Sequence, residues 1–416
     1  MVSAVVVAAA VAVPAVLRTV GSGAGQATPV ALPAAAAPKI STTPFGYAMQ
    51  TLDRQEQALL RGDEKGWLAA VDARKPKLVA RYRGMFRSLR GLGVSHFNYE
   101  PSLSPDSKGT TAKLNVGIAY CLSRPTCPPG RGAAPRVSQA LTLAPSAGRY
   151  VITRLGRAPH PDELQPTPWE QGELVFAHGP RVTVAGPPSQ RKNLRRVLAA
   201  AEKSAKINDR FAGYVRNPQV RYRILLADEK AWKSWYGGID GGWTVGYAVP
   251  LNNAGTDVVL RMRKLTGSRE LLTTTIQHEL GHVVTLSGAD GRDFDRNQWL
   301  SEGIAEYIGW APRHAADSWR RSSVRAAFHD GKKPKSVVLK GLSATASDTV
   351  SDRFYGLGHF TADCLATRYG EPALFDFVRL TLREAKTYDQ ASRAAFGKPF
   401  PAVDKDCLSW IRKTAS

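Results

Sequence analysis

The stretch TTIQHELGHVVTL, residues 273–285, constrains this chain most, because it sets two histidines and a glutamate inside an apolar run. The pattern predicts a helix. Positions four apart on a helix differ by about 40° around its axis, so His278 and His282 project from one face and can hold one metal ion. Glu279 is turned aside and could reach a metal-bound water without becoming a ligand. The alternative is a core helix that contains two histidines by chance.

A site of this kind needs a third protein ligand and an open position. The metzincin pattern would require glycine at position 285 and histidine at 288, and it is excluded because Thr285 and Gly288 stand there. Downstream, QWLSEGIAEYIGW sets Glu302 and Glu306 on one face of an otherwise apolar helix. Burying carboxylates without partners is costly, and a bound zinc ion would supply the partner.

HELGH followed by WLSEGIAEY resembles the gluzincin zinc metallopeptidases, in particular their peptidase MA-like group, over residues 188–416. Carried over by position, the resemblance implies His278, His282 and Glu302 as zinc ligands and Glu279 as general base. The interval of 19 residues between His282 and Glu302 is one longer than in the aminopeptidase N family, and the loop SGADGRDFDRNQ can absorb it. The sequence has no G-A-M-E-N segment, which favours an endopeptidase over an exopeptidase.

The resemblance also implies roles for three further residues. Glu306 matches the acidic residue that orients the first histidine in thermolysin-like enzymes, with a solvated surface glutamate as the alternative. Within DRFYGLGHFTADCLATRYG, Tyr355 or His359 would stabilise the oxyanion, and Tyr355 is preferred. A core aromatic and an ordinary helix histidine remain the alternatives. GWTVGYAVPL lies where such enzymes keep an edge strand that pairs with an extended peptide.

The charge balance is strongly basic, with 57 Lys and Arg against 35 Asp and Glu, a net +22. The basic clusters RYRGMFRSLR, RKNLRR and GKKPK lack the aromatic interleaving and the motifs of a nucleic-acid-binding protein. No specific nucleic-acid partner is therefore expected. The charge would instead favour anionic cell-envelope polymers or lipid headgroups, unless these faces are simply solvated.

The first forty residues predict export. MVSAVVVAAAVAVPAVL resembles the apolar part of a signal peptide without its basic start, and residues 1–40 continue as an Ala- and Pro-rich linker. The apolar run before Arg18 is shorter than the roughly 20 residues that span a bilayer, so release and membrane anchoring both stay open.

The cysteines support export. None has C-x-x-C spacing, and their positions predict two disulfides, Cys121 with Cys127 and Cys364 with Cys407. Four free buried thiols are the alternative.

With 416 residues the chain is expected to form two α+β domains. In residues 41–187, helical periodicity to about 95 gives way to alternating strands, which predicts helices on one face of a curved antiparallel sheet. That order resembles the nuclear-transport-factor-2-like cone fold. Residues 188–416 predict a small mixed sheet, a central HExxH helix and a mainly helical C-terminal part.

The expected function is that of a secreted or membrane-tethered zinc-dependent endopeptidase. Glu279 would remove the proton of a metal-activated water that attacks the peptide carbonyl. One alternative is a non-catalytic, basic envelope-binding protein with a relict zinc site, although a relict site has no use for Glu279. The other is a zinc amidase or esterase acting on a non-peptide substrate. Oligomeric state stays open.

Overall fold

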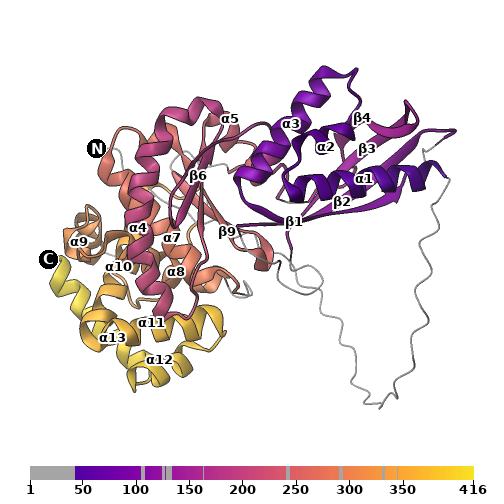
Figure 1. Cartoon of the computed structure of the whole chain (residues 1–416). Helices are drawn as coiled ribbons and strands as arrows, with labels where there is room; N and C mark the ends of the chain where they lie inside the picture. Colours follow the sequence, from indigo (N-terminus) through magenta and orange to yellow (C-terminus); the bar gives the residue numbers. More distant parts are fainter. Residues whose placement is uncertain are drawn as a thin grey trace, which may run out of the picture.

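The computed structural model describes residues 43–104, 108–123, 127, 134–162, 164–239, 244–289, 294–329, 333–343 and 345–416. It is a mixed α+β structure with two sheets and a helical C-terminal part, which confirms the predicted fold class (Figure 1). The predicted signal or anchor segment lies outside the described residues. Within the described ranges, no helix combines the length and the apolar character needed to cross a membrane.

Three helices and a four-stranded sheet form the N-terminal part. Helix α1 (Pro44–Arg61) starts at Thr43, whose side chain accepts a hydrogen bond from the backbone N–H of Gly46, and it is followed by α2 (Glu64–Ala69) and α3 (Pro76–Gly91). The strands run antiparallel in sequence order. They are β1 (Val94–Leu103), β2 (Ala112–Leu122), β3 (Arg136–Ser146) and β4 (Arg149–Arg157). The predicted arrangement of helices packed on an antiparallel sheet is confirmed (Figure 1).

The second sheet has five strands in the order β5-β6-β7-β9-β8. The central strands β6, β7 and β9 are parallel, and the edge strands β5 and β8 pair antiparallel. The bounds are β5 (Val175–His178), β6 (Val182–Gly186), β7 (Tyr222–Ala227), β8 (Gly246–Pro250) and β9 (Thr256–Arg261).

Strands β5 and β6 correct one expectation. The sequence predicted them in the antiparallel sheet of residues 41–187, whereas β5 pairs with β6 and β6 pairs with β7 in the second sheet, so sheet membership changes after β4. The five residues of β6 are all buried, as is typical of a strand covered on both faces. The alternation of apolar and polar residues identified the two strands but could not show which sheet they join.

The second sheet packs on both faces. Since successive side chains of a strand point to opposite sides, Ile224 joins one core with α4 (Leu194–Tyr214), and Leu225 joins the other core with the N-terminal helices. The five-stranded sheet therefore connects the two parts that the sequence predicted as domains. A buried hydrogen bond of 3.0 Å from Arg223 Nη1 to the carbonyl of Leu122 links the two sheets directly.

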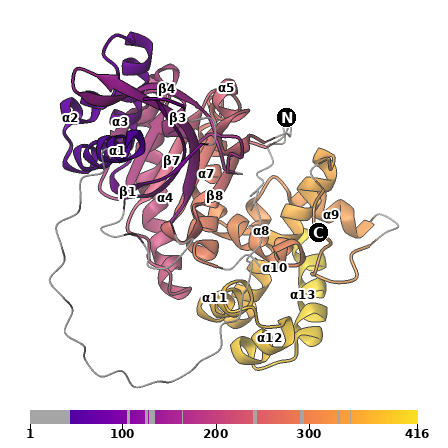
Figure 2. The same cartoon turned by 90° about the vertical axis from the view of Figure 1, so that its right-hand side faces the viewer.

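The C-terminal part is helical and lies at the end of the molecule away from α1–α3 (Figures 1 and 2). Short helices α5 (Glu229–Trp232) and α6 (Met262–Leu265) flank the second sheet. The remaining helices are α7 (Arg269–Leu286), α8 (Phe294–Trp310), α9 (Arg321–His329), α10 (Asp348–Tyr369), α11 (Glu371–Val378), α12 (Tyr388–Phe396) and α13 (Phe400–Ala415).

Both predicted disulfides are present, and none of the four cysteines is free. Cys364–Cys407 joins α10 to α13, and Cys121–Cys127 closes a short loop after β2. The predicted cysteine pairing is confirmed.

Candidate metal centre

Helix α7 carries the HELGH sequence through the middle of the C-terminal part. Its N-cap is Ser268, whose hydroxyl accepts a hydrogen bond of 3.1 Å from the backbone N–H of Leu271. The helix packs against α4, α8 and β8, and residues 274–285 are all buried. It is therefore both a core helix and the helix of the candidate site, so the two interpretations of this stretch are not exclusive.

Helix α8 brings Glu302 to the two histidines. The Nε2 atoms of His278 and His282 lie 3.1 Å apart, and each lies 3.4 Å from Oε2 of Glu302. All three side chains are buried, and their donor atoms form one compact triangle. The three residues predicted as metal ligands are thus brought together.

Several buried polar atoms of this centre have no hydrogen-bond partner among the described residues. In the described part of the chain, no hydrogen bond reaches either carboxylate oxygen of Glu279 or of Glu302, or Nδ1 of His282. Buried polar groups are normally hydrogen-bonded, and buried carboxylates without partners are costly. A cation among these atoms removes that cost, so the group of His278, His282 and Glu302 could hold a metal ion.

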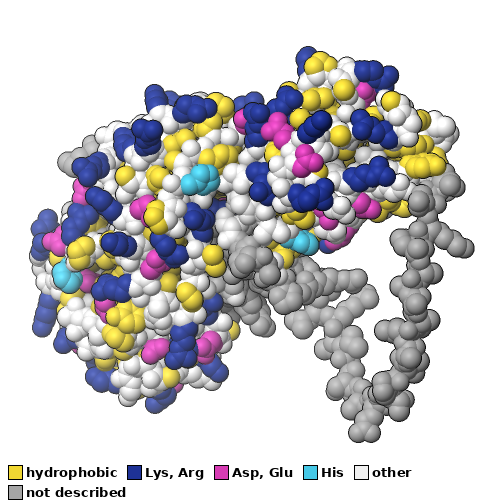
Figure 3. Space-filling model, viewed as in Figure 1, with side chains coloured by type: hydrophobic (Ala, Val, Ile, Leu, Met, Phe, Trp, Pro, Cys, Tyr) yellow, Lys and Arg dark blue, Asp and Glu magenta, His cyan; other side chains and the backbone are white. Residues whose placement is uncertain are grey.

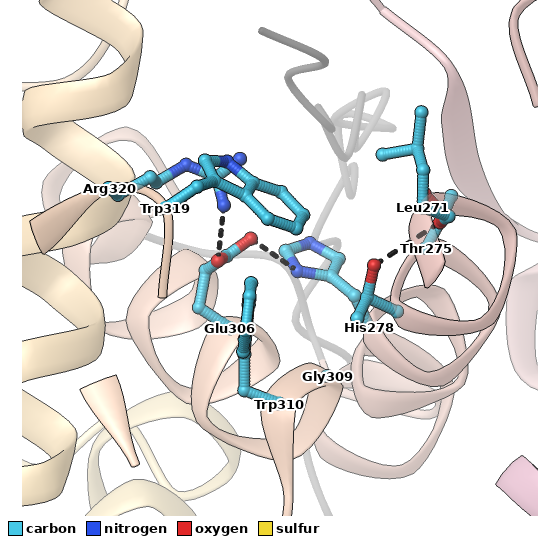
Figure 4. Close-up of a pocket in the computed structure, with 9 residues that line it drawn as sticks. Leu271, Thr275, His278, Glu306, Gly309, Trp310, Trp319 and Arg320 are labelled. Carbon is cyan, nitrogen blue, oxygen red and sulfur yellow. Dashed lines mark hydrogen bonds and ion pairs between the residues drawn. The ribbon is translucent and has the colours of Figure 1, made fainter. Parts of the chain in front are cut away.

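Glu306 lies on the other side of His278 (Figure 4). Its Oε1 is 3.1 Å from His278 Nδ1, and its Oε2 accepts a hydrogen bond of 2.6 Å from Nη1 of Arg320. Burial would raise the pKa of Glu306, but Arg320 and His278 outweigh it and hold the pKa at about 2. Glu306 is buried, so the alternative of a solvated surface glutamate does not apply.

The pKa values of the two other buried carboxyls, Glu279 and Glu302, shift in opposite directions. Burial raises the pKa of Glu279 to about 8, because no donor neutralises its charge. Glu302 is equally buried, yet His282 and His278 lower its pKa. Burial lowers the pKa of His282, whereas contacts with Glu302 and Glu306 overcome burial and raise the pKa of His278 to about 10. These directions describe the metal-free protein, and a bound cation would favour carboxylate and neutral imidazole.

Helix α10 passes close to α8 because glycine faces glycine at the crossing. A Cβ added to Gly303 would stand 2.6 Å from the carbonyl oxygen of Gly358, too close for any side chain. This approach sets Tyr355 beside the centre, with its ring centroid 6.2 Å from that of His278. The Tyr355 hydroxyl is buried and has no hydrogen-bond partner in the described residues. Burial, with the charges of Glu302 next, raises its pKa well above the usual value.

His359 lies one turn further along α10, and its ring centroid is 6.3 Å from that of Trp310. Neither ring nitrogen has a partner among the described residues, and burial lowers its pKa to about 4. After burial, the charges that act most on the pKa of His359 are those of Glu306 and Asp363, whereas for Tyr355 the charge that acts most is that of the predicted ligand Glu302. Of the two candidates, Tyr355 is the one placed toward the predicted ligands.

Strand β8 is an edge strand, as the resemblance implied, and no other described strand pairs with its free side. Its first residue lies over the predicted general base, because a Cβ on Gly246 would stand 2.9 Å from Oε1 of Glu279. The edge strand therefore approaches the helix that carries HELGH closely enough that a side chain here would make the Glu279 carboxylate or the strand shift.

Sequence reasoning missed Arg320 and Gly246. Arg320 stands in the run SWRRSS beside Arg321, and nothing in that run distinguishes the buried arginine from its neighbour. Gly246 is one of 37 glycines, and its role depends on a contact between a strand and a helix that no local pattern encodes.

Comparison with known proteins adds no relative. No family model matches this chain, and no curated protein matches its sequence. The similarity to gluzincins therefore depends on the residues of the site themselves.

Proposed function

We propose that this protein is a zinc-dependent metallopeptidase whose metal is held by His278, His282 and Glu302. The observation that carries the proposal is the donor triangle with sides of 3.1, 3.4 and 3.4 Å. In a tetrahedral site with zinc–ligand bonds near 2.0–2.1 Å, donor atoms lie about 3.3 Å apart. Two histidines and one carboxylate also match the donor set of catalytic zinc in peptidases.

The retained carboxyl of Glu279 favours catalysis over a relict site. Zinc, when bound, would activate a water molecule and polarise the amide carbonyl as a Lewis acid. Glu279 accepts the proton of the attacking water and delivers it to the nitrogen of the departing amine. A dication nearby favours the ionised form of Glu279, which the base role requires. The Tyr355 hydroxyl, which has no partner among the described residues, donates to the developing oxyanion.

The edge position of β8 supports a peptide substrate. An extended peptide can add to the free side of an edge strand through main-chain hydrogen bonds, and β8 begins directly over Glu279. A peptide paired with β8 would run past Glu279 and would not need its N- or C-terminus to be bound by the enzyme. We therefore infer cleavage within a chain rather than removal of its first residue.

We also infer that the protein is exported and that its charge attracts anionic cell-envelope polymers. The two disulfides support an oxidising compartment. On the face shown in Figure 3, Lys and Arg side chains are spread over both halves of the molecule. Such dispersed charge gives long-range attraction toward anionic surfaces rather than a defined binding site.

Glu279→Gln tests the proposal. Glutamine keeps the size of the side chain but cannot accept the proton, so we expect unchanged zinc content and a fall in turnover of about 10² to 10⁴. Turnover is measured on a library of unstructured peptides. Glu270→Gln is the matched control, because Glu270 lies exposed on the same helix and should leave turnover unchanged.

Two outcomes would contradict the proposal. Peptide hydrolysis by purified Glu279→Gln at the parental rate would exclude Glu279 as the base. A parent protein that holds zinc but cleaves no peptide would favour either a non-catalytic role or a non-peptide substrate, and a panel of amide and ester substrates would then separate these two.

A further inference from the structure

Arg320 is a buried arginine that touches both sides of the metal centre. It directly precedes α9, only 2% of it is exposed, and it lies between α8 and α10. Its Nη1 donates to Glu306 of α8, and its Nε lies 3.4 Å from Oδ1 of Asp352 on α10. Its guanidinium carbon stands 5.3 Å from the ring centroid of Tyr355.

Through Glu306, Arg320 is connected to the proposed metal ligand His278. One oxygen of Glu306 accepts from Arg320, and the other lies 3.1 Å from His278 Nδ1. A planar guanidinium fixes the orientation of a carboxylate that it pairs with. The carboxylate in turn fixes the ring of His278, since a ligating imidazole is oriented by the partner of its second nitrogen.

The contact with α10 reaches the residue proposed for the oxyanion. Asp352 and Tyr355 are one turn apart on α10, so they lie on the same side of the helix. Arg320 pairs with the first and stacks on the ring of the second, an arrangement that stabilises a cation over an aromatic face. One side chain thereby connects α8 to α10 at the level of the site.

We propose that Arg320 is a positioning residue that holds His278, through Glu306, and Tyr355 in a fixed relation to each other. Removing it frees Glu306 to rotate away from His278 and removes the cation from the face of Tyr355. The part that concerns Tyr355 rests on the proposed peptidase activity. The part that concerns His278 does not, because metal retention is measurable without a substrate.

Arg320→Lys and Arg320→Gln test this role in the full-length protein. Lysine keeps the charge, but its single ammonium lacks the planar fork that faces Glu306 and Asp352 together. We expect both variants to lose zinc to a chelator about 10- to 100-fold faster than the parent, as for other losses of a residue behind a metal ligand. We expect kcat to fall while KM changes little, because Arg320 is buried and offers no surface to a bound peptide.

Arg313→Lys is the matched control. Arg313 is an exposed arginine of the same region that stacks on Trp310 at 4.2 Å and reaches no predicted ligand. Its substitution should leave zinc release and kcat unchanged. Melting temperature, measured on all variants, identifies any that fail to fold.

Chemical rescue separates positioning from a general loss of packing. Arg320 lines a small pocket with Glu306, His278 and Trp319 (Figure 4), so Arg320→Ala leaves room for a small cation there. Methylguanidinium at millimolar concentration should slow zinc release from Arg320→Ala and leave Arg313→Lys unaffected. A merely structural loss would not respond to the added cation.

Folded Arg320→Lys and Arg320→Gln that release zinc at the parental rate would overturn the proposal, and so would the absence of rescue in folded Arg320→Ala. If the parent binds zinc but cleaves no peptide, the proposed function fails while zinc release still tests Arg320. If the parent cleaves peptides and the variants keep their zinc and kcat, only the role of Arg320 fails.

Discussion

Two buried arginine–carboxylate pairs of this protein differ in what surrounds them. Arg223 and Asp257 lie in the second sheet, with Nε of Arg223 at 2.5 Å from Oδ1 of Asp257. The other carboxylate oxygen of Asp257 accepts from the hydroxyl of Tyr236, and Arg223 also donates to the carbonyl of Leu122. Both oxygens of this carboxylate have a partner, so the cluster holds strands and sheets together.

The pair of Arg320 and Glu306 lies beside groups that have no such partners. Glu279, Glu302, Tyr355 and His359 all have buried polar atoms without a hydrogen bond in the described residues. In the first cluster only Nη2 of Arg223 lacks a hydrogen-bond partner among the described residues, so the cluster stabilises the fold, whereas the second leaves several buried donors and acceptors without partners and incurs a folding cost. Such a cost at a site is expected where the atoms serve a metal, a substrate or a transition state.

The largest expected difference is in stability without metal. Asp257→Asn leaves the buried charge of Arg223 without its counter-charge, so we expect a loss of about 3–5 kcal/mol in the free energy of unfolding. Glu279→Gln removes a carboxyl that has no partner to lose, so we expect stability to stay at the parental value or rise. Urea unfolding of both variants in the presence of a chelator measures the difference.

The double variant Arg223→Met with Asp257→Leu is the control for that comparison. It removes both charges together and should recover much of the loss, because a buried pair is often replaceable by apolar residues of similar volume. Equal destabilisation by Asp257→Asn and Glu279→Gln would show that the two clusters do not differ as described.

The pH dependence of stability should distinguish the clusters next. The folded, metal-free protein raises the pKa of Glu279 from 4.5 to about 8 through burial. Between these values the folded state keeps a proton that the unfolded state has released, so Glu279 makes stability fall as pH rises, by at most about 1.4 kcal/mol per pH unit. Above the folded pKa this contribution becomes constant.

Glutamine does not titrate, so Glu279→Gln removes this pH-dependent contribution to the free energy of unfolding. Its stability should therefore exceed that of the parent by an amount that grows through the same pH window, measured by urea unfolding with chelator present. Parallel curves for parent and Glu279→Gln would show that Glu279 is not held neutral by burial.

The parts of the site that lie within one helix could be predicted from the sequence. Spacing on a helix converts directly into geometry, so the sequence alone placed His278 with His282, and Glu302 with Glu306, on shared faces. The meeting of these two helices was inferred from a resemblance, and the structure brings the four residues together.

The parts that depend on contacts between distant segments could not be predicted. Arg320 stands ten residues after the end of α8 and contacts Glu306 on that helix, and its neighbour Arg321 has the same chemistry in the sequence. Strand β6 alternates like its predecessors, but its partner β7 follows only after the 21-residue helix α4. Periodicity describes one element at a time, so it identifies faces but not their neighbours.

The smallest expected effect concerns the contact between β8 and α7. Gly246→Ala would place a methyl group 2.9 Å from Oε1 of Glu279, so the carboxylate or the strand must shift by a few tenths of an ångström. The proposed metal ligands lie on α7 and α8 and should keep zinc at the parental content. Turnover should fall by about 10- to 100-fold, because small misplacement of a catalytic group is costly.

Gly267→Ala is the matched control for this prediction, since a Cβ there meets no atom within 4 Å. It should leave both zinc content and turnover at parental values. The comparison is sharpened if Gly246→Ala loses turnover with its stability unchanged, because the unpartnered carboxyl of Glu279 then responds to position alone. If Gly246→Ala instead turns over peptide at the parental rate, the strand does not fix the position of the Glu279 carboxyl.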